Sequence, residues 1–185
     1  MKRHILTIGL AAVISAIAFV PATALATPSN LNHATYLFSI GEPSAGLLGP
    51  DVSIAPNGST VTMSGHGQFN AGPDKSVSGG GDYTIKDASG ATVAKGAWTA
   101  TQMLSFVNYG SATPQGLPAN FYGGQAQMKV TLSGVGTGLL NINCTLGTPP
   151  PGHGDAAGEE GIDLMLGNGL TFNREAFGQT IFVIP

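Results

Sequence analysis

The stretch SGGGDYTIKDASGATVAKGAWTATQMLSFVNYG, residues 78–110, decides the fold class because it contains the clearest strand-turn-strand pattern in the chain. Tyr83 and Ile85 alternate with polar residues, turn residues follow at 87–90, and a second β-rich run extends from Ala91 to Thr99. Alternation with a period of two on either side of Asp, Ser and Gly predicts a β-hairpin.

The only tryptophan of the chain, Trp98, lies in the second arm of this hairpin. A bulge near Gly96 would bring Val93 and Trp98 onto the same face. Because an indole buries ~150–250 Å², we expect Trp98 to anchor the core. The alternative is an exposed aromatic residue at a binding surface.

The same alternation of polar and apolar residues continues on both sides of this hairpin in the sequence. Further strands are predicted at 35–40, 60–69, 104–109, 126–132, 140–146, 162–166, 170–172 and 180–184. Only residues 99–104 have a sequence pattern that is compatible with either a helix or a strand. One polar and one apolar face per strand is typical of antiparallel sheets. We therefore predict a single all-β domain, an antiparallel β-sandwich of about 8–10 strands, with a closed β-barrel as the alternative.

Residues 1–26 have the pattern of a secretory signal peptide. A basic start precedes an apolar run from Ile5 to Val20, and the small-x-small sequence at 24–26 suits cleavage. The apolar run is shorter than the ~20 residues that a membrane-spanning helix needs. We expect a mature domain of residues 27–185 that is secreted, either extracellular or periplasmic, with no membrane span in the mature chain.

Charged residues are scarce, at 9% of the chain, with ten acidic and seven basic residues and a net charge of -3. Without Lys2 and Arg3 of the leader, five basic residues face ten acidic ones, which gives about -5. This balance argues against nucleic acid as a partner. The 28 glycines and the few charges are typical of an extracellular β-protein with an uncharged polar surface. Polysaccharide, another protein and self-association all stay open as partners.

Catalytic motifs are missing from the sequence: it has no Gly-x-Ser-x-Gly, no phosphate-binding loop, no His-Glu-x-x-His and no cysteine pair. We therefore expect a non-catalytic domain with a binding or structural role, and no cofactor. A second hypothesis is a barrel-type carrier of a small apolar ligand. The residues that would line its cavity, or else simply fill the core, are Met63, Phe69, Tyr83, Trp98, Met128 and Val130.

The longest connection between predicted strands spans residues 110–124 and contains Phe121 and Tyr122. Long loops that carry aromatic residues often hold binding sites. These two residues and Trp98 are therefore the candidate ligand-binding residues. The alternative is that Phe121 and Tyr122 plug one end of the fold.

A second irregular loop, residues 147–161, holds the densest group of ionisable residues in the chain. Its candidate metal ligands are His153, Asp155, Glu159 and Glu160. Carboxylates in a flexible glycine-rich loop are a ligand type that calcium accepts. The alternative is that this acidic loop is ordinary solvated surface.

Cys144 and the sequence PPPGH ending at His153 are similar to the copper-binding loop of cupredoxins, in which a strand-ending cysteine precedes Pro-Gly-His. The number of residues between the cysteine and the histidine is larger here than in the cupredoxin loop. Met165 also lies too far along the chain for that family's pattern. A degenerate cupredoxin-like metal-binding domain is the remaining alternative. Strand alternation places Cys144 on the apolar face of its strand, so we expect an inert thiol and no copper.

The stretches SGGGDYTIKDASGATVAKGAWTAT, LSFVNYG, GTGLLNINCTLG and LTFNREAFGQTIFVIP resemble those of a family of uncharacterised secreted bacterial β-rich proteins. The resemblance would cover most of the mature chain. It implies export and a β-rich domain, and it supplies no activity, cofactor or site residue.

Overall fold

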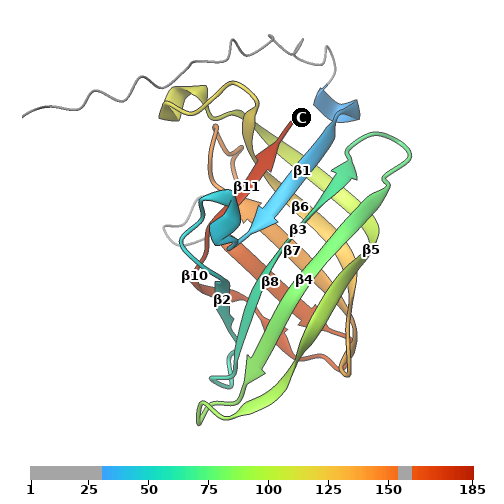
Figure 1. The fold of residues 1–185 in the computed structure, drawn as a ribbon, viewed down its shortest axis with the longest axis vertical. Helices are drawn as coiled ribbons and strands as arrows, with labels where there is room; N and C mark the ends of the chain where they lie inside the picture. The colour runs from blue at the N-terminus through green and yellow to red at the C-terminus, as the bar shows by residue number, and fades with distance from the viewer. Residues whose placement is uncertain (1–30, 154–159) are drawn as a thin grey trace, which may run out of the picture.

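The computed structural model describes residues 31–153 and 160–185, and strands make up most of this part of the chain (Figure 1). The strands are β1 (Thr35–Ile40), β2 (Asp51–Ile54), β3 (Thr60–Asn70), β4 (Val77–Lys86), β5 (Thr92–Ser111), β6 (Phe121–Leu132), β7 (Gly136–Cys144), β8 (Gly161–Leu166), β9 (Thr171–Phe172), β10 (Arg174–Phe177) and β11 (Thr180–Val183). Three 3-10 turns accompany them: η1 (Leu31–His33) precedes β1, η2 (Pro43–Ala45) joins β1 to β2, and η3 (Thr113–Gln115) joins β5 to β6. The predicted all-β class is confirmed. Within the described ranges, none of the helical segments has the length and apolarity needed to cross a membrane.

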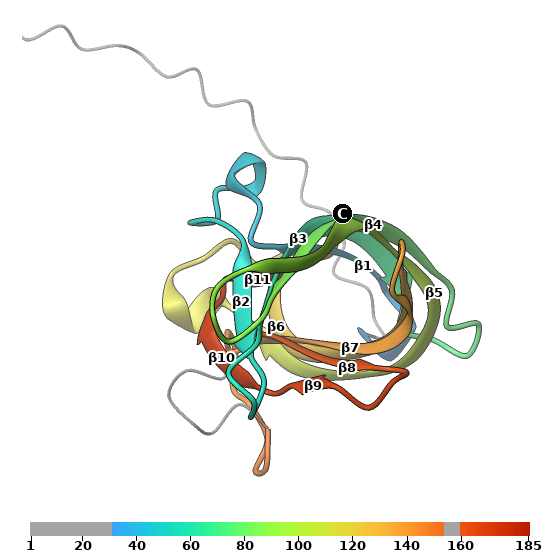
Figure 2. The same ribbon diagram turned by 90° about the horizontal axis from the view of Figure 1, so that it is seen from below.

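The eleven strands of the described chain belong to one antiparallel sheet that curls around a common core (Figure 2). Hydrogen-bonded pairing runs from β1 through β3, β4, β5, β6 and β11 and returns to β1. The strands β7, β8 and β9 continue the sheet from β6, and β2 and β10 continue it from β3.

Strands β3 and β6 each pair with two different strands along one of their edges, so the sheet branches at both strands. Strand β3 pairs with β2 through Thr60–Met63 and with β1 through Gly65–Asn70. Strand β6 pairs with β11 at Phe121 and Tyr122 and with β7 from Gly124 onward. The arrangement is therefore not a regular barrel, and it is consistent with the predicted all-β sandwich.

The predicted hairpin is formed by β4 and β5, but its bulge lies elsewhere than expected. Ile85 pairs with Ala94 and Lys86 pairs with Thr92, so the extra residue is Val93 and not one near Gly96. Val93 is 61% exposed whereas Trp98 is 1% exposed, so the prediction that the two share a face is wrong. No helix forms at 99–104, where β5 continues without a break.

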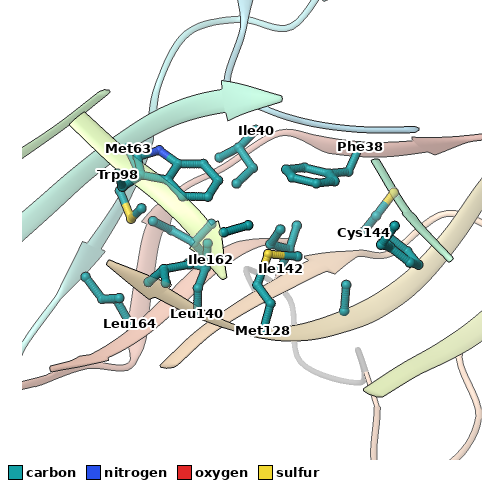
Figure 3. Packing of buried hydrophobic residues seen from close by; sticks show 14 of the residues in the cluster. Phe38, Ile40, Met63, Trp98, Met128, Leu140, Ile142, Cys144, Ile162 and Leu164 are labelled. Carbon is teal, nitrogen blue, oxygen red and sulfur yellow. The ribbon is translucent and has the colours of Figure 1, made fainter. Parts of the chain in front are cut away.

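Buried aromatic and aliphatic side chains from most strands meet in one core (Figure 3). The rings of Tyr36, Phe69 and Phe182 pack edge to face or stacked, at centroid distances of 5.4 and 5.8 Å. All six side chains proposed for a ligand cavity belong to this cluster: Met63, Phe69, Tyr83, Trp98, Met128 and Val130. Their packing against other core residues supports the interpretation that they fill the fold.

Candidate functional site

The candidate site begins with glycines on two neighbouring strands. Residues 65–67 of β3 lie opposite residues 79–81 of β4, so that Gly65 pairs with Gly81 and Gly67 with Gly79. Along each strand these four glycines lie an even number of residues from Met63 or Tyr83, whose side chains are buried, so they face the same side of the sheet. They therefore occupy inward positions that a larger side chain would otherwise take.

Two aromatic rings fill the space that these glycines leave. A Cβ atom on Gly67 would lie 2.8 Å from Cε1 of Phe38, and one on Gly65 would lie 2.8 Å from Cζ2 of Trp98. The absence of side chains thus allows the backbone of β3 and β4 to pack directly against these two rings.

A depression of about 370 Å³ lies on the outer surface over this segment. It is lined by Leu37, His66, Gly67, Gln68, Ser78, Gly79 and Gly80. Leu37 is 40% exposed and supplies the apolar part of the wall. The polar groups are an imidazole, a primary amide and a hydroxyl, and no lysine, arginine or carboxylate is among the lining residues.

His66 is held at the rim of this depression by Glu42, which precedes the η2 turn. The His66 Nδ1 lies 2.9 and 3.0 Å from the two carboxylate oxygens of Glu42, while the His66 side chain is 71% exposed. Because a carboxylate only accepts, Nδ1 carries the hydrogen of this bond. In the neutral imidazole, Nε2 is therefore an acceptor that is free to face a ligand.

Replacing Gly67 by alanine should lower the free energy of unfolding by about 1–3 kcal/mol, the usual cost of overpacking. The new methyl group would collide with the Ser78 carbonyl oxygen and lie 2.8 Å from the Phe38 ring. Urea denaturation followed by circular dichroism measures the change. The control is Gly167→Ala, whose methyl group would meet nothing closer than 3.3 Å. Equal stabilities of the two variants would show that the inward glycines are not closely packed.

The three aromatic residues predicted to bind a ligand do not come together at a surface. Trp98 is a core residue, and its Nε1 donates a hydrogen bond of 2.9 Å to the Ser64 carbonyl oxygen. Phe121 and Tyr122 begin β6 and pair with β11, so they are strand residues and not part of a loop. Tyr122 is buried and meets Tyr36 edge to face at a centroid distance of 5.8 Å.

The predicted metal ligands are only partly described. His153 Nδ1 lies 2.9 Å from Oε1 of Gln125, and the His153 ring packs 6.2 Å from that of Tyr109. Glu160 accepts hydrogen bonds from Thr145 and Thr180. Asp155 and Glu159 lie outside the described residues. Within residues 31–153 and 160–185, no three His, Cys, Asp or Glu side chains are grouped closely enough to suggest a metal ion.

Cys144 is a free, buried cysteine at the end of β7. Burial, with a further contribution from the negative charge of Glu160, raises the pKa of its thiol to about 12. Its Sγ lies 3.8 Å from the Tyr122 carbonyl oxygen, which accepts its weak hydrogen bond. These surroundings support the expectation of an inert thiol.

Two features were not identified from the sequence. The depression over β3 and β4 has a local signal in the similar stretches GHGQF and GGGDY, but only the strand register shows that their glycines face each other. The second feature is Asp51, whose side chain is buried although the residue type is usually exposed. The alternation of Asp51 and Ser53 with Val52 and Ile54 would place the two apolar residues inside, so the local sequence gives no signal for the burial of Asp51.

Comparisons with known proteins assign neither a family nor a function to this chain. No protein family, curated protein or solved structure matches this chain.

Proposed function

We propose that this protein is a secreted, non-catalytic β-domain that binds a neutral polysaccharide in the depression over β3 and β4. The observation that carries the proposal is the chemistry of the lining. Neutral hydrogen-bonding groups and one exposed leucine surround a floor of glycine backbone. The volume of about 370 Å³ lies within the ~300–1,000 Å³ that small-molecule sites usually have.

Each lining group matches a part of a sugar ring. The Gln68 amide and the Ser78 hydroxyl both donate and accept hydrogen bonds, as sugar hydroxyl groups do. The Nε2 atom of His66 adds an acceptor. The methyl groups of Leu37 offer an apolar contact for the C–H face of the sugar, and the glycine floor leaves room for the ring.

The charges around the site favour a neutral polymer over an acidic one. Anionic polymers are bound chiefly through lysine and arginine, and neither lines the depression. The composition of the whole chain agrees, since only 9% of its residues are charged.

A large protein partner has less support than a polysaccharide. Protein interfaces usually need a contiguous surface with an apolar centre. The exposed large apolar side chains of the described chain are Leu37, Leu48, Val93, Met165 and Phe177, and no two of them lie on the same strand.

Export is supported by the leader pattern of residues 1–26. The carrier hypothesis lacks comparable support, because the side chains assigned to its cavity pack in the core. The missing catalytic motifs support a non-catalytic role.

The double variant His66→Ala, Gln68→Ala should weaken polysaccharide binding about tenfold, since each lost hydrogen bond is worth roughly 0.5–1.5 kcal/mol. The measurement is affinity electrophoresis and sedimentation against cellulose, chitin, mannan and xylan, with pectin as an acidic comparison. Thr131→Ala removes an exposed hydroxyl from β6 and serves as the control.

Binding of the wild type to at least one neutral polymer, with wild-type affinity in the control, is the expected result. Absence of binding to every neutral polymer, or full binding by the double variant, would contradict the proposed function.

A further inference from the structure

A buried carboxyl group lies at the end of the loop that holds His66. This loop spans residues 41–50 between β1 and β2, and its Glu42 binds the His66 imidazole. Asp51 follows the loop directly, as the first residue of β2, and is 0% exposed. A Cβ atom on Gly41 would lie 2.6 Å from the backbone N of Asp51. The backbone next to Glu42 therefore packs against that of Asp51.

Gln179, which lies just before β11, joins the Asp51 side chain to both ends of this loop. Its N–H donates a hydrogen bond of 2.8 Å to Asp51 Oδ1. Its carbonyl oxygen accepts a bond of 2.9 Å from the Gly41 N–H, and its side-chain Oε1 accepts one of 2.7 Å from the Leu48 N–H. Through this one residue, the position of the carboxyl group is coupled to the position of the loop.

The surroundings of Asp51 do not favour a negative charge. Its Oδ2 has no hydrogen-bond partner. The titratable groups nearest to it are all acids: Glu160 just before β8, Glu175 on β10 and, beyond Glu160, the Cys144 thiol on β7. No lysine, arginine or histidine of the described chain forms an ion pair with Asp51 or Glu160. An ionised Asp51 would therefore be a buried charge without a cation beside it.

A proton removes this charge. Burial raises the pKa of Asp51 to about 7, the Gln179 N–H opposes this shift, and the charge of Glu160 adds to it. Because the pKa is raised in the closed arrangement, the stabilising effect of the proton is present in acid and is lost as the pH rises through about 7. Above that pH, the cost of the buried charge is relieved if the start of β2 moves and water reaches the carboxylate.

We propose that protonation of Asp51 regulates the proposed polysaccharide site by closing the loop of residues 41–50 against His66 in acid and releasing it in alkali. This inference rests on the proposed function. When Asp51 ionises and β2 shifts, the loop loses its contacts with Gln179. Glu42 then no longer fixes the orientation of the imidazole at the rim of the depression. Since only the closed population binds with full affinity, the apparent dissociation constant rises as that population falls.

The test is the affinity of the full chain for cellulose, chitin, mannan and xylan at pH 5.5 and pH 8.5, measured by affinity electrophoresis and sedimentation. For a polymer that binds at pH 5.5, the wild type should bind about fivefold more weakly at pH 8.5. Asp51→Asn cannot ionise and should bind equally at both pH values. Asp74→Asn changes an exposed carboxylate and should keep the wild-type dependence.

Nuclear magnetic resonance of the ¹⁵N-labelled wild type without sugar keeps the proposal falsifiable if Asp51→Asn does not fold. The amide signals of Gly41 and Leu48 should shift over the same pH range with a common midpoint near 7, together with that of Gln179. The control is the amide of Gly116, which donates to the Thr113 carbonyl oxygen in η3 and should not shift.

Equal affinity of the wild type at both pH values would overturn the proposal, as would a pH dependence that persists in Asp51→Asn. Amides of Gly41 and Leu48 that do not shift with pH would also overturn it. The proposed function survives each of these outcomes, because it requires only that a neutral polymer binds at the depression. Absence of binding to all four polymers at both pH values would instead contradict the proposed function, and this inference with it.

Discussion

Trp98→Ala should lower the free energy of unfolding by about 3–5 kcal/mol, the usual cost of removing a large buried aromatic side chain. The Trp98 side chain is 1% exposed and lies 6.5 Å from the Phe38 ring between centroids. Its loss leaves a cavity beside Gly65, whose missing side chain is replaced by the indole. It also removes the hydrogen bond from Nε1 to the Ser64 carbonyl oxygen.

Urea denaturation followed by far-ultraviolet circular dichroism measures this loss. Val93→Ala is the matched control, because Val93 lies on the same strand and is 61% exposed. The control should change stability by less than about 0.5 kcal/mol. A loss below 1 kcal/mol in Trp98→Ala would contradict the role of Trp98 as the core anchor on which β3 and β4 pack.

The second large effect is a dependence of stability on pH that comes from Asp51. Its pKa is raised by burial from 3.8 to about 7, so the folded protein binds this proton more tightly than the unfolded chain. The free energy of unfolding therefore falls as the pH rises from 3.8 to 7. The slope is roughly 1.4 kcal/mol per pH unit and halves near pH 7, so the wild type should lose about 2 kcal/mol between pH 5 and pH 7 in EDTA.

Asp51→Asn should remove this dependence, because asparagine has no proton to lose. Asp87 does not mask the effect: hydrogen bonds from Ser89 and from neighbouring backbone N–H groups lower its pKa, so its contribution disappears only under more acidic conditions. Urea titrations at several pH values in EDTA give the comparison. Stability that is constant or rises from pH 5 to pH 7 in the wild type would contradict the assignment, as would an unchanged slope in Asp51→Asn.

Much of the fold could be predicted from local alternation. The strands at 126–132 and 140–146 were evident because each residue's polarity reports which face of the sheet it occupies. The branching at β3 and β6 could not be predicted in this way. It depends on which distant segment meets each half of a strand, and alternation carries no such information.

The site residues show the same limit. Aromatic residues in an irregular segment suggested recognition at Phe121 and Tyr122, yet tertiary pairing with β11 makes them part of a strand. The depression depends instead on glycines at facing register positions. The surroundings of the buried Asp51 carboxylate depend on a contact between β2 and a residue more than a hundred positions later, Gln179.

Nuclear magnetic resonance titration of the ¹⁵N-labelled protein with a soluble oligosaccharide of the bound polymer tests the central claim most directly. The account predicts that the largest shifts occur at the backbone amides of Gly67, Gly79 and Gly80 and at the side-chain amide of Gln68, with smaller changes on β6 and β7. Shifts centred on any other surface, or no shifts at concentrations that saturate binding to the polymer, would contradict it.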